Sequence, residues 1–391
     1  MNPPITAGDQ VPGPAPLPTD SAAGPRRTLP VEFHGRALDY FRVWIVNVLL
    51  TVVTLGVWSA WAKVRTRRWF YGHTRIDGHS FDYHATGRQI LVGRIIALAV
   101  LVAASIISRL SPAGSLAVTI AILCLLSWTV NAGLRFSAAM MSWRNVRFGF
   151  QGNYMRAACV FLLMPALAVL TLGLLTPLAS RMAGRYVAGG YRYGNAAFAS
   201  TPRLGALYGA LVLSILVFFV IMILGLLLAA AVAAADGIDV SMETLALDWY
   251  AFLYAPEGRP PAYDSGLLKL LIAALGPSFY AAFFIAGLYY GACLRNELFK
   301  RLTLTGGHRM QSRLSPLVLI WIVISGLVAA VVTLGLAYPW ARVRHYRYLT
   351  QSLTVLAAPG LDELVSQQQN APGSFGSEFS ELEGFGSAAM F

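Results

Sequence analysis

The sequence predicts an all-α protein that passes through a membrane several times, and three features lead to this fold class. Apolar residues make up 57% of the chain and charged residues only 12%, whereas about a quarter of the residues in a soluble domain are charged. The mean hydropathy is +0.59. The apolar residues are gathered into about seven segments, each long enough to approach or cross a hydrocarbon core of about 30 Å.

The seven segments follow one another along the chain and leave its two ends polar. They cover residues 43–62, 90–108, 114–134, 157–179, 204–235, 267–292 and 315–341. Residues 1–30 are rich in Pro, Ala and Gly and lack the pattern of a cleaved signal, so we expect a disordered cytoplasmic tail. Residues 356–391 are polar and acidic and are expected to form a second disordered tail. The membrane domain is then 31–355.

One short phrase occurs three times, as Thr54-Leu55-Gly56, Thr171-Leu172-Gly173 and Thr333-Leu334-Gly335, and arginines follow each copy. When the chain is aligned with itself at an offset of 117 residues, 13 of the 49 positions from 33 to 81 are identical. A third copy aligns at an offset of 279 around the phrase. We therefore predict three internal repeats, near residues 31–85, 145–200 and 300–355.

The positions of the charges predict the topology, because Lys and Arg near span ends favour the cytoplasm. The loop 236–266 holds six acidic residues and one cation, Arg259, so we expect it to be periplasmic. Segments 90–108 and 114–134 are expected to form a hairpin with its outer turn at 109–112. Both tails are then cytoplasmic.

The three phrase-bearing segments have cations at both ends, which does not suit a complete crossing. We hypothesise that they dip into the membrane from the cytoplasmic side and turn near Gly56, Gly173 and Gly335, with Pro177 and Pro339 contributing to the break. These five residues are candidates to break helices or to line a pore. Seven complete crossings are the alternative.

Small cytoplasmic β-hairpins are predicted next to the repeats. The stretch 74–81 contains an Asp-Gly turn between two short extended runs, and 191–198 is its counterpart. The stretches 31–35 and 147–152 are expected to pair with them as partner strands.

Residues of the first repeat resemble a known family. They are Phe33-His34-Gly35, Thr54-Leu55-Gly56, Ser59-Ala60-Trp61-Ala62-Lys63-Val64-Arg65 and Asp77-Gly78. These runs resemble the YjgN-like family of bacterial inner-membrane proteins, and the resemblance covers roughly residues 30–355. It implies a multi-pass protein of the bacterial inner membrane. Because that family is a domain of unknown function, the resemblance assigns no catalytic or ligand residue.

The candidate binding residues are the cations that follow the phrase. Three of them, Arg68, Arg185 and Arg347, occupy one equivalent position in the three copies. The others are Arg75 and Arg192, which match in two copies, and Lys63, Arg65, Arg342 and Arg344. We predict that they bind an anionic headgroup or substrate at the cytoplasmic face, while ordinary anchoring and topology are the alternative. The positive-inside loops explain the net charge of +12 without a nucleic-acid partner.

His73, His79 and His84 lie close together beside acidic residues and are weak candidates for a metal site. Polar residues of a hairpin are the alternative, and no cofactor is expected. The sequence has no phosphate-binding Gly loop and no His-Glu-x-x-His motif.

The leading functional prediction is a channel, a transporter or a lipid-handling protein without an ATP site. The alternative is a membrane scaffold that binds anionic phospholipid or a cytoplasmic partner through its basic face. A metal-dependent membrane enzyme comes third. The sequence does not identify a solute or a protein partner.

Overall fold

The ten short antiparallel strands of the protein form one closed barrel. The computed structural model describes residues 26–235 and 266–370, with isolated residues of the segment between them. The strands are β1 (Arg27–Phe33), β2 (Thr74–Ile76), β3 (His79–Tyr83), β4 (Met141–Trp143), β5 (Val146–Phe150), β6 (Tyr191–Tyr193), β7 (Ala196–Ser200), β8 (Leu302–Leu304), β9 (His308–Ser312) and β10 (Leu353–Ala357). Each pairs with its neighbours in sequence, and β1 pairs with β10 to close the barrel.

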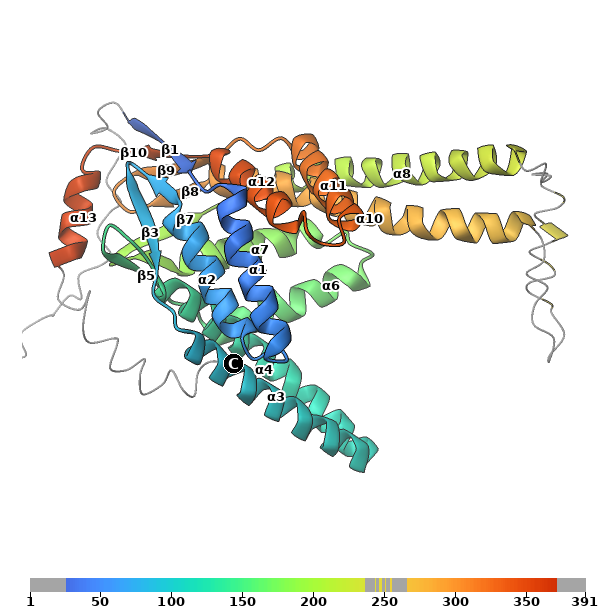
Figure 1. Cartoon of the computed structure of the whole chain (residues 1–391), viewed down its shortest axis with the longest axis horizontal. Coiled ribbons are helices and arrows are strands. Elements are labelled where there is room, and N and C mark those ends of the chain that lie inside the picture. The colour runs from blue at the N-terminus through green and yellow to red at the C-terminus, as the bar shows by residue number, and fades with distance from the viewer. Residues whose placement is uncertain are drawn as a thin grey trace, which may run out of the picture.

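Tight turns and helical hairpins alternate around the barrel. Turns join β2 to β3, β4 to β5, β6 to β7 and β8 to β9, whereas a pair of antiparallel helical arms lies between each of the other successive strands. The five helical hairpins therefore leave from one rim, and the tight turns form the other (Figure 1).

Two of the helical hairpins are long. They consist of α3 (Gly87–Leu110) with α4 (Pro112–Ala139), and of α8 (Leu204–Ala235) with α10 (Gly266–Lys300). Within the described residues, these four helices are long and apolar enough to cross a membrane. The turn between α3 and α4 lies at Ser111, within the range 109–112 predicted for it, and the Ser111 hydroxyl accepts a hydrogen bond from the N–H of Gly114 (3.0 Å).

The other three hairpins are short, and each contains the Thr-Leu-Gly phrase at its tip. They are α1 (Ala37–Val53) with α2 (Ser59–Gly72), α11 (Pro316–Val332) with α12 (Tyr338–Gln351), and an arm of α5 (Tyr154–Ala158), a π-helical stretch (Cys159–Leu163) and α6 (Met164–Leu170) with α7 (Thr176–Gly190). Three of the seven predicted segments are thus each divided at the phrase.

Alternating burial explains why the strands close around a core. In β1 the side chains of Leu29, Val31 and Phe33 are buried, while those between them are exposed, as a period of two residues requires. The β2–β3 turn has positive φ at Asp77 (51°) and Gly78 (75°), the conformation of a two-residue hairpin turn that matches strand twist.

The predicted all-α fold class is wrong, because the strands join into one closed barrel rather than separate small hairpins. A closed ring leaves no strand edge unpaired. This gives three-residue strands such as β2 and β4 a stability that isolated two-stranded hairpins lack.

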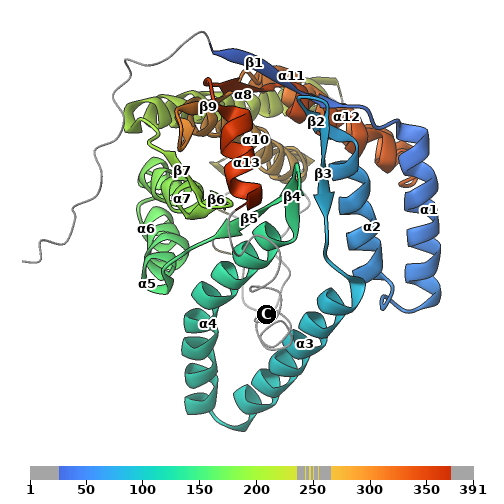
Figure 2. The ribbon, with the colours of Figure 1, turned by 90° about the vertical axis from the view of Figure 1, so that its left-hand side faces the viewer.

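One further helix, α13 (Leu361–Asn370), lies over the end of the barrel formed by the tight turns and is seen at the centre of Figure 2. It falls inside the segment 356–391 for which a disordered tail was predicted. Most of the predicted periplasmic loop 236–266 and most of the tail 1–30 lie outside the described residues.

Candidate functional site

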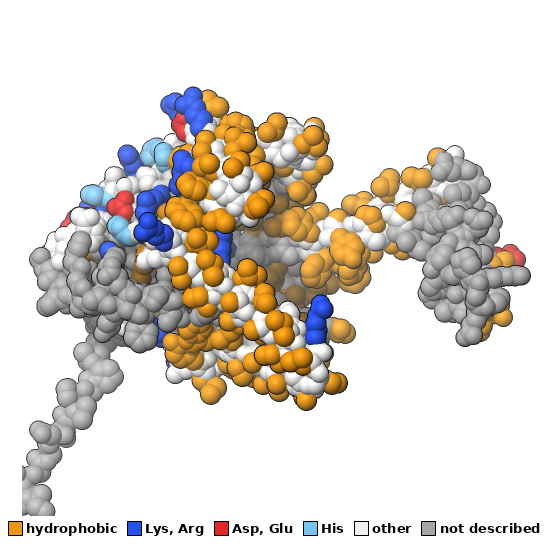
Figure 3. Space-filling model, turned by 60° about the horizontal axis from the view of Figure 1, so that its bottom comes forward, with side chains coloured by type: hydrophobic (Ala, Val, Ile, Leu, Met, Phe, Trp, Pro, Cys, Tyr) orange, Lys and Arg blue, Asp and Glu red, His pale blue; other side chains and the backbone are white. Residues whose placement is uncertain are grey.

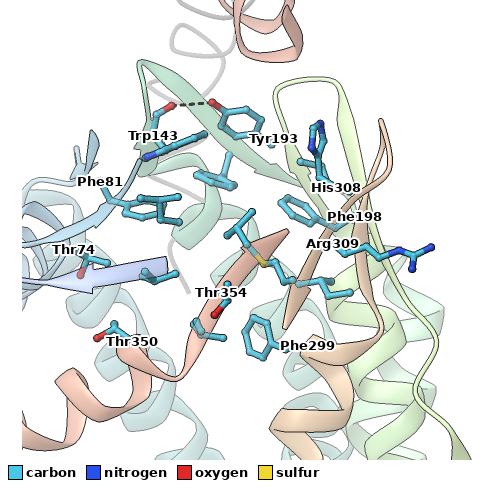
Figure 4. A pocket seen from close by; sticks show the side chains of 18 of the residues that line it. Thr74, Phe81, Trp143, Tyr193, Phe198, Phe299, His308, Arg309, Thr350 and Thr354 are labelled. Atoms are coloured by element: carbon cyan, nitrogen blue, oxygen red, sulfur yellow. Dashed lines mark hydrogen bonds between the residues drawn. The ribbon is translucent and has the colours of Figure 1, made fainter. Parts of the chain in front are cut away.

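The barrel surrounds a partly open apolar cavity of about 480 Å³ to which all ten strands contribute. Three of its lining aromatic side chains, Phe81, Phe148 and Phe198, come from β3, β5 and β7 and form a row. The ring centroid of Phe148 lies 6.5 Å from that of Phe81 and 6.5 Å from that of Phe198, and both pairs are stacked. Trp143 and Tyr193 extend this aromatic wall (Figure 4).

Several polar groups in the cavity wall already have partners within the protein. The Tyr193 hydroxyl donates to the carbonyl of Trp143 (3.1 Å), and burial raises the pKa of Tyr193 above its usual range. The Thr350 hydroxyl bonds to the carbonyl of Tyr346 (3.0 Å). These groups are neutral and occupied, so the wall presents mainly apolar surface to whatever it encloses.

His308 is the buried imidazole of the wall. Its Nδ1 accepts a hydrogen bond from the backbone N–H of Ala358 (3.0 Å), which fixes the neutral form with the proton on Nε2. Burial lowers the pKa of His308. The bond also holds the chain at the point where it leaves β10 for α13.

The helix α13 closes the cavity at the rim of tight turns. Leu361 and Leu364 pack against the barrel core, and Val365 is 1% exposed. The Arg144 guanidinium donates to the Asp362 carboxylate (2.7 Å) and lowers the pKa of that carboxyl. The Arg144 carbonyl accepts from the Gln369 side chain (2.7 Å). The turn between β4 and β5 thus holds α13 through one residue.

Two of the three equivalent arginines bind backbone carbonyls where strands leave the barrel. Arg68 donates to the carbonyls of Tyr83 (3.1 Å) and Ala85 (3.0 Å), and Arg347 donates to that of Gly35 (2.9 Å). Arg185 is exposed on α7. The arginines of α2 and α12 therefore lie at different strand exits and tie each helix to a neighbouring strand.

The remaining predicted cations are divided between the hairpins and the outside of the barrel. Arg65 donates to the Asn47 side chain (3.3 Å), Arg344 to the Ser325 hydroxyl (2.7 Å) and Arg342 to the Tyr40 hydroxyl (3.0 Å), each from the return arm of a short hairpin to another helix. The others lie elsewhere: Lys63 and Arg75 are exposed, and Arg192 donates to the Gln151 side chain (3.0 Å).

The predicted helix-breaking residues behave in two ways. Gly56, Gly173 and Gly335 have φ of 92°, 88° and 91° and end the ingoing arms. Pro177 and Pro339, in contrast, lie in the first turns of α7 and α12, where the missing N–H is tolerated. The glycines reverse the chain and the prolines begin the return helices.

The three histidines that were weak metal candidates each contact a different group. His73 and His79 bond to the carbonyls of Trp69 and Asp77, both at 2.7 Å, and His84 bonds to the Ser142 hydroxyl (2.8 Å). Among the residues that the structure describes, no three His, Cys, Asp or Glu side chains are grouped to hold a metal ion.

Comparisons with known proteins place the chain in a family. Residues 28–382 match the family model described as "Bacterial protein of unknown function (DUF898)". The chain belongs to this family.

Two relatives match the chain over different lengths. The chain is 25% identical to "Inner membrane protein YjgN" of Salmonella typhimurium over 346 residues, which is 83% of this chain and 87% of the relative. It is 30% identical to the protein of that name from Escherichia coli O157:H7 over 154 residues, or 38% of each. No solved structure matches the chain significantly.

Sequence reasoning missed a set of exposed arginines, one near the start of each helical hairpin. The set comprises Arg36, Arg88, Arg156, Arg203 and Arg313. We call it the arginine rim. Figure 3 shows Lys and Arg side chains gathered where the barrel meets hairpins covered in hydrophobic side chains. In the sequence, an arginine follows each of β1, β3, β5, β7 and β9 by one to six residues. This regularity can be recognised only once the strands are known.

Proposed function

We propose that the protein is an inner-membrane lipid-binding protein whose barrel holds the apolar part of a lipophilic molecule. The observation that carries this proposal is the apolar cavity of about 480 Å³. Ligand pockets measure about 300–1,000 Å³ and are mostly apolar. The location rests on the names of the relatives and on the four long apolar helices.

The energy of an empty cavity supports an occupant. At about 24 cal/mol per Å³, an apolar void of about 480 Å³ would cost up to about 12 kcal/mol if it were closed and empty, against a free energy of unfolding of about 5–15 kcal/mol for a typical domain. This cavity is partly open, so the cost of leaving it without an apolar occupant is smaller than that upper limit. Water would find few partners against such walls, so an apolar molecule suits the cavity best.

The occupied hydrogen bonds favour an acyl chain over a polar solute. Tyr193 and Thr350 donate within the protein, and Nδ1 of His308 accepts from the backbone, so the Nε2–H of His308 is the donor that these three residues leave for a ligand. A polar solute with several hydrogen-bonding groups would leave most of them without partners among these residues, at a cost of about 1–3 kcal/mol for each buried group. Among the predicted activities of channel, transporter and lipid-handling protein, the cavity therefore favours lipid handling.

The test is binding of a fluorescent fatty-acyl probe to the detergent-purified protein. Val31 lines the cavity and is 6% exposed, whereas its neighbour Glu32 is exposed on the outside of β1. Val31→Trp is expected to weaken probe binding at least tenfold, and Glu32→Trp to leave it unchanged. Leu304→Trp, from β8, places its larger side chain in the same cavity and replaces Val31→Trp if that variant does not fold. Unchanged binding in a folded cavity-filling variant would refute the proposal.

The arginine rim favours a second role, the binding of anionic phospholipid headgroups. Each Lys or Arg near an anionic surface contributes about 1 kcal/mol, and one of the five exposed arginines lies near the start of each helical hairpin. The triple variant R36Q/R203Q/R313Q in nanodiscs is expected to lose most of the thermal stabilisation that phosphatidylglycerol gives over phosphatidylcholine. R75Q, on an exposed strand residue, is the control. An equal response of both variants would exclude this role.

A further inference from the structure

The tips of the three short hairpins share an unusual backbone conformation. Leu55, Leu172 and Leu334 have φ of 49°, 51° and 50°, in the left-handed region that residues with a Cβ rarely occupy. Their side chains are 95%, 96% and 94% exposed. The same apolar residue is therefore held in the same strained turn, pointing away from the protein, at three separate places.

Leucine is a poor choice for such a turn in water. The left-handed conformation costs roughly 1–2 kcal/mol for a residue with a Cβ, and Gly or Asn would avoid much of this cost. A leucine side chain that leaves water for an apolar medium gains about 1.5–3 kcal/mol. The choice of leucine is thus favourable where the tip lies in hydrocarbon.

The backbone at the first tip is prepared for an apolar medium. The N–H of Gly56 donates to the carbonyl of Thr51 (2.7 Å) and the N–H of Leu55 to that of Val52 (3.1 Å). The Thr54 hydroxyl donates to the carbonyl of Leu50 (2.7 Å) and accepts from the N–H of Trp58 (2.9 Å). The other two tips repeat this pattern. Groups that are paired within the turn can enter the membrane interior without a large penalty.

The cations of the return arms limit how deep the tips can reach. The first cation after each tip glycine is Lys63, Arg181 or Arg342, seven or eight residues later, or about 10–12 Å along a helix. If the tips crossed to the far side of a core of about 30 Å, these cations would lie inside it, each at a cost of about 2.5–3.5 kcal/mol. A tip near mid-depth leaves them close to the headgroups.

We propose that the three leucine-tipped hairpins embed in only the leaflet nearest the barrel, while α3–α4 and α8–α10 cross the whole membrane. The membrane partner of each tip is the acyl-chain layer of that one leaflet. The exposed apolar residues beside the tips, such as Val53 (78%), Leu170 (78%) and Val332 (76%), extend this layer of contact. The proposal is independent of what the barrel cavity binds.

The test is the reactivity of single cysteines toward a membrane-impermeant maleimide, applied to either face of sealed membranes. The background replaces Cys124, Cys159 and Cys293 by serine, and its folding is checked by size-exclusion chromatography. Cysteines are placed at the three tip leucines. Ser111, in the turn of a crossing hairpin, and Asn145, in a turn of the barrel, are the controls for the two faces.

We expect Ser111→Cys to react from one face and Asn145→Cys from the other. The tip cysteines should react from neither face and become reactive after detergent solubilisation. Reaction of the tips from the face that labels Ser111→Cys would show complete crossings and overturn the proposal. Reaction from the face that labels Asn145→Cys would place the tips in water and overturn it as well. Val53→Cys provides a second site if a tip variant does not fold.

Discussion

The three equivalent arginines should differ in how much they stabilise the protein. All three arginines are exposed, but Arg68 makes two hydrogen bonds to backbone carbonyls and Arg347 makes one, whereas Arg185 has no such bond within the described residues. A hydrogen bond from a charged group contributes roughly 1.5–3 kcal/mol, and the exposure of these arginines to solvent favours the lower value. We therefore expect losses of about 3 kcal/mol for Arg68→Ala, about 1.5 kcal/mol for Arg347→Ala and less than about 0.5 kcal/mol for Arg185→Ala.

The assay is denaturant unfolding of the three variants in a neutral detergent, where no anionic lipid is present. Arg68→Lys separates geometry from charge, because an ammonium group cannot reproduce the two-pronged contact of the guanidinium, and it should recover less than half of the loss. Equal losses for the three alanine variants would refute this reasoning. Normal stability in detergent with a loss of stabilisation by anionic lipid would instead support headgroup binding at these positions.

The other predictions concern a buried imidazole, a close backbone contact and a hairpin tip. Because burial lowers the pKa of His308, the contribution of the neutral imidazole to folding stability is complete above about pH 6.5 and is lost as the pH falls through the lowered pKa. His308→Asn retains an acceptor for the backbone N–H, so the unfolding midpoint of this variant should change less with pH below about pH 6.5 than that of the parent protein. Gly35→Ala would place its Cβ 2.5 Å from two aromatic rings and should cost about 1–3 kcal/mol in unfolding free energy, whereas Gly72→Ala, with open space around it, should not. Thr54→Val should cost about 0.5–2 kcal/mol through the lost acceptor for a backbone N–H, as measured in detergent by thermal unfolding; an equal loss in Thr51→Val would contradict it.

The sequence was informative about local breaks and turns. The phrase glycines end helices because a left-handed φ suits Gly, and the Asp77-Gly78 pair forms a hairpin turn as its composition predicts. The strands β1 and β5 also pair near the predicted positions. Each of these features depends on a few neighbouring residues, so a pattern in one sequence is sufficient to find it.

The barrel could not be predicted in the same way. Strands such as β2, β4 and β6 have three residues each, which is too short for an alternating pattern to be recognised. Their pairing joins residues that are far apart in sequence, as in Phe81 with Trp143. The cavity follows from this closure, so its aromatic wall was also invisible. The arginines were found as equivalent positions, but their carbonyl partners belong to neighbouring strands and could not be named.

The seam between β1 and β10 has a consequence for how the protein is made. It pairs Arg27 with Ala357 and Pro30 with Thr354, near the two ends of the membrane domain. During synthesis the edge of β1 therefore stays unpaired until the last helical hairpin, α11–α12, and the strand β10 that follows it have been made. Barrel closure is the final step of assembly, and a chain truncated before residue 353 would keep its membrane helices while exposing two unpaired strand edges to other chains.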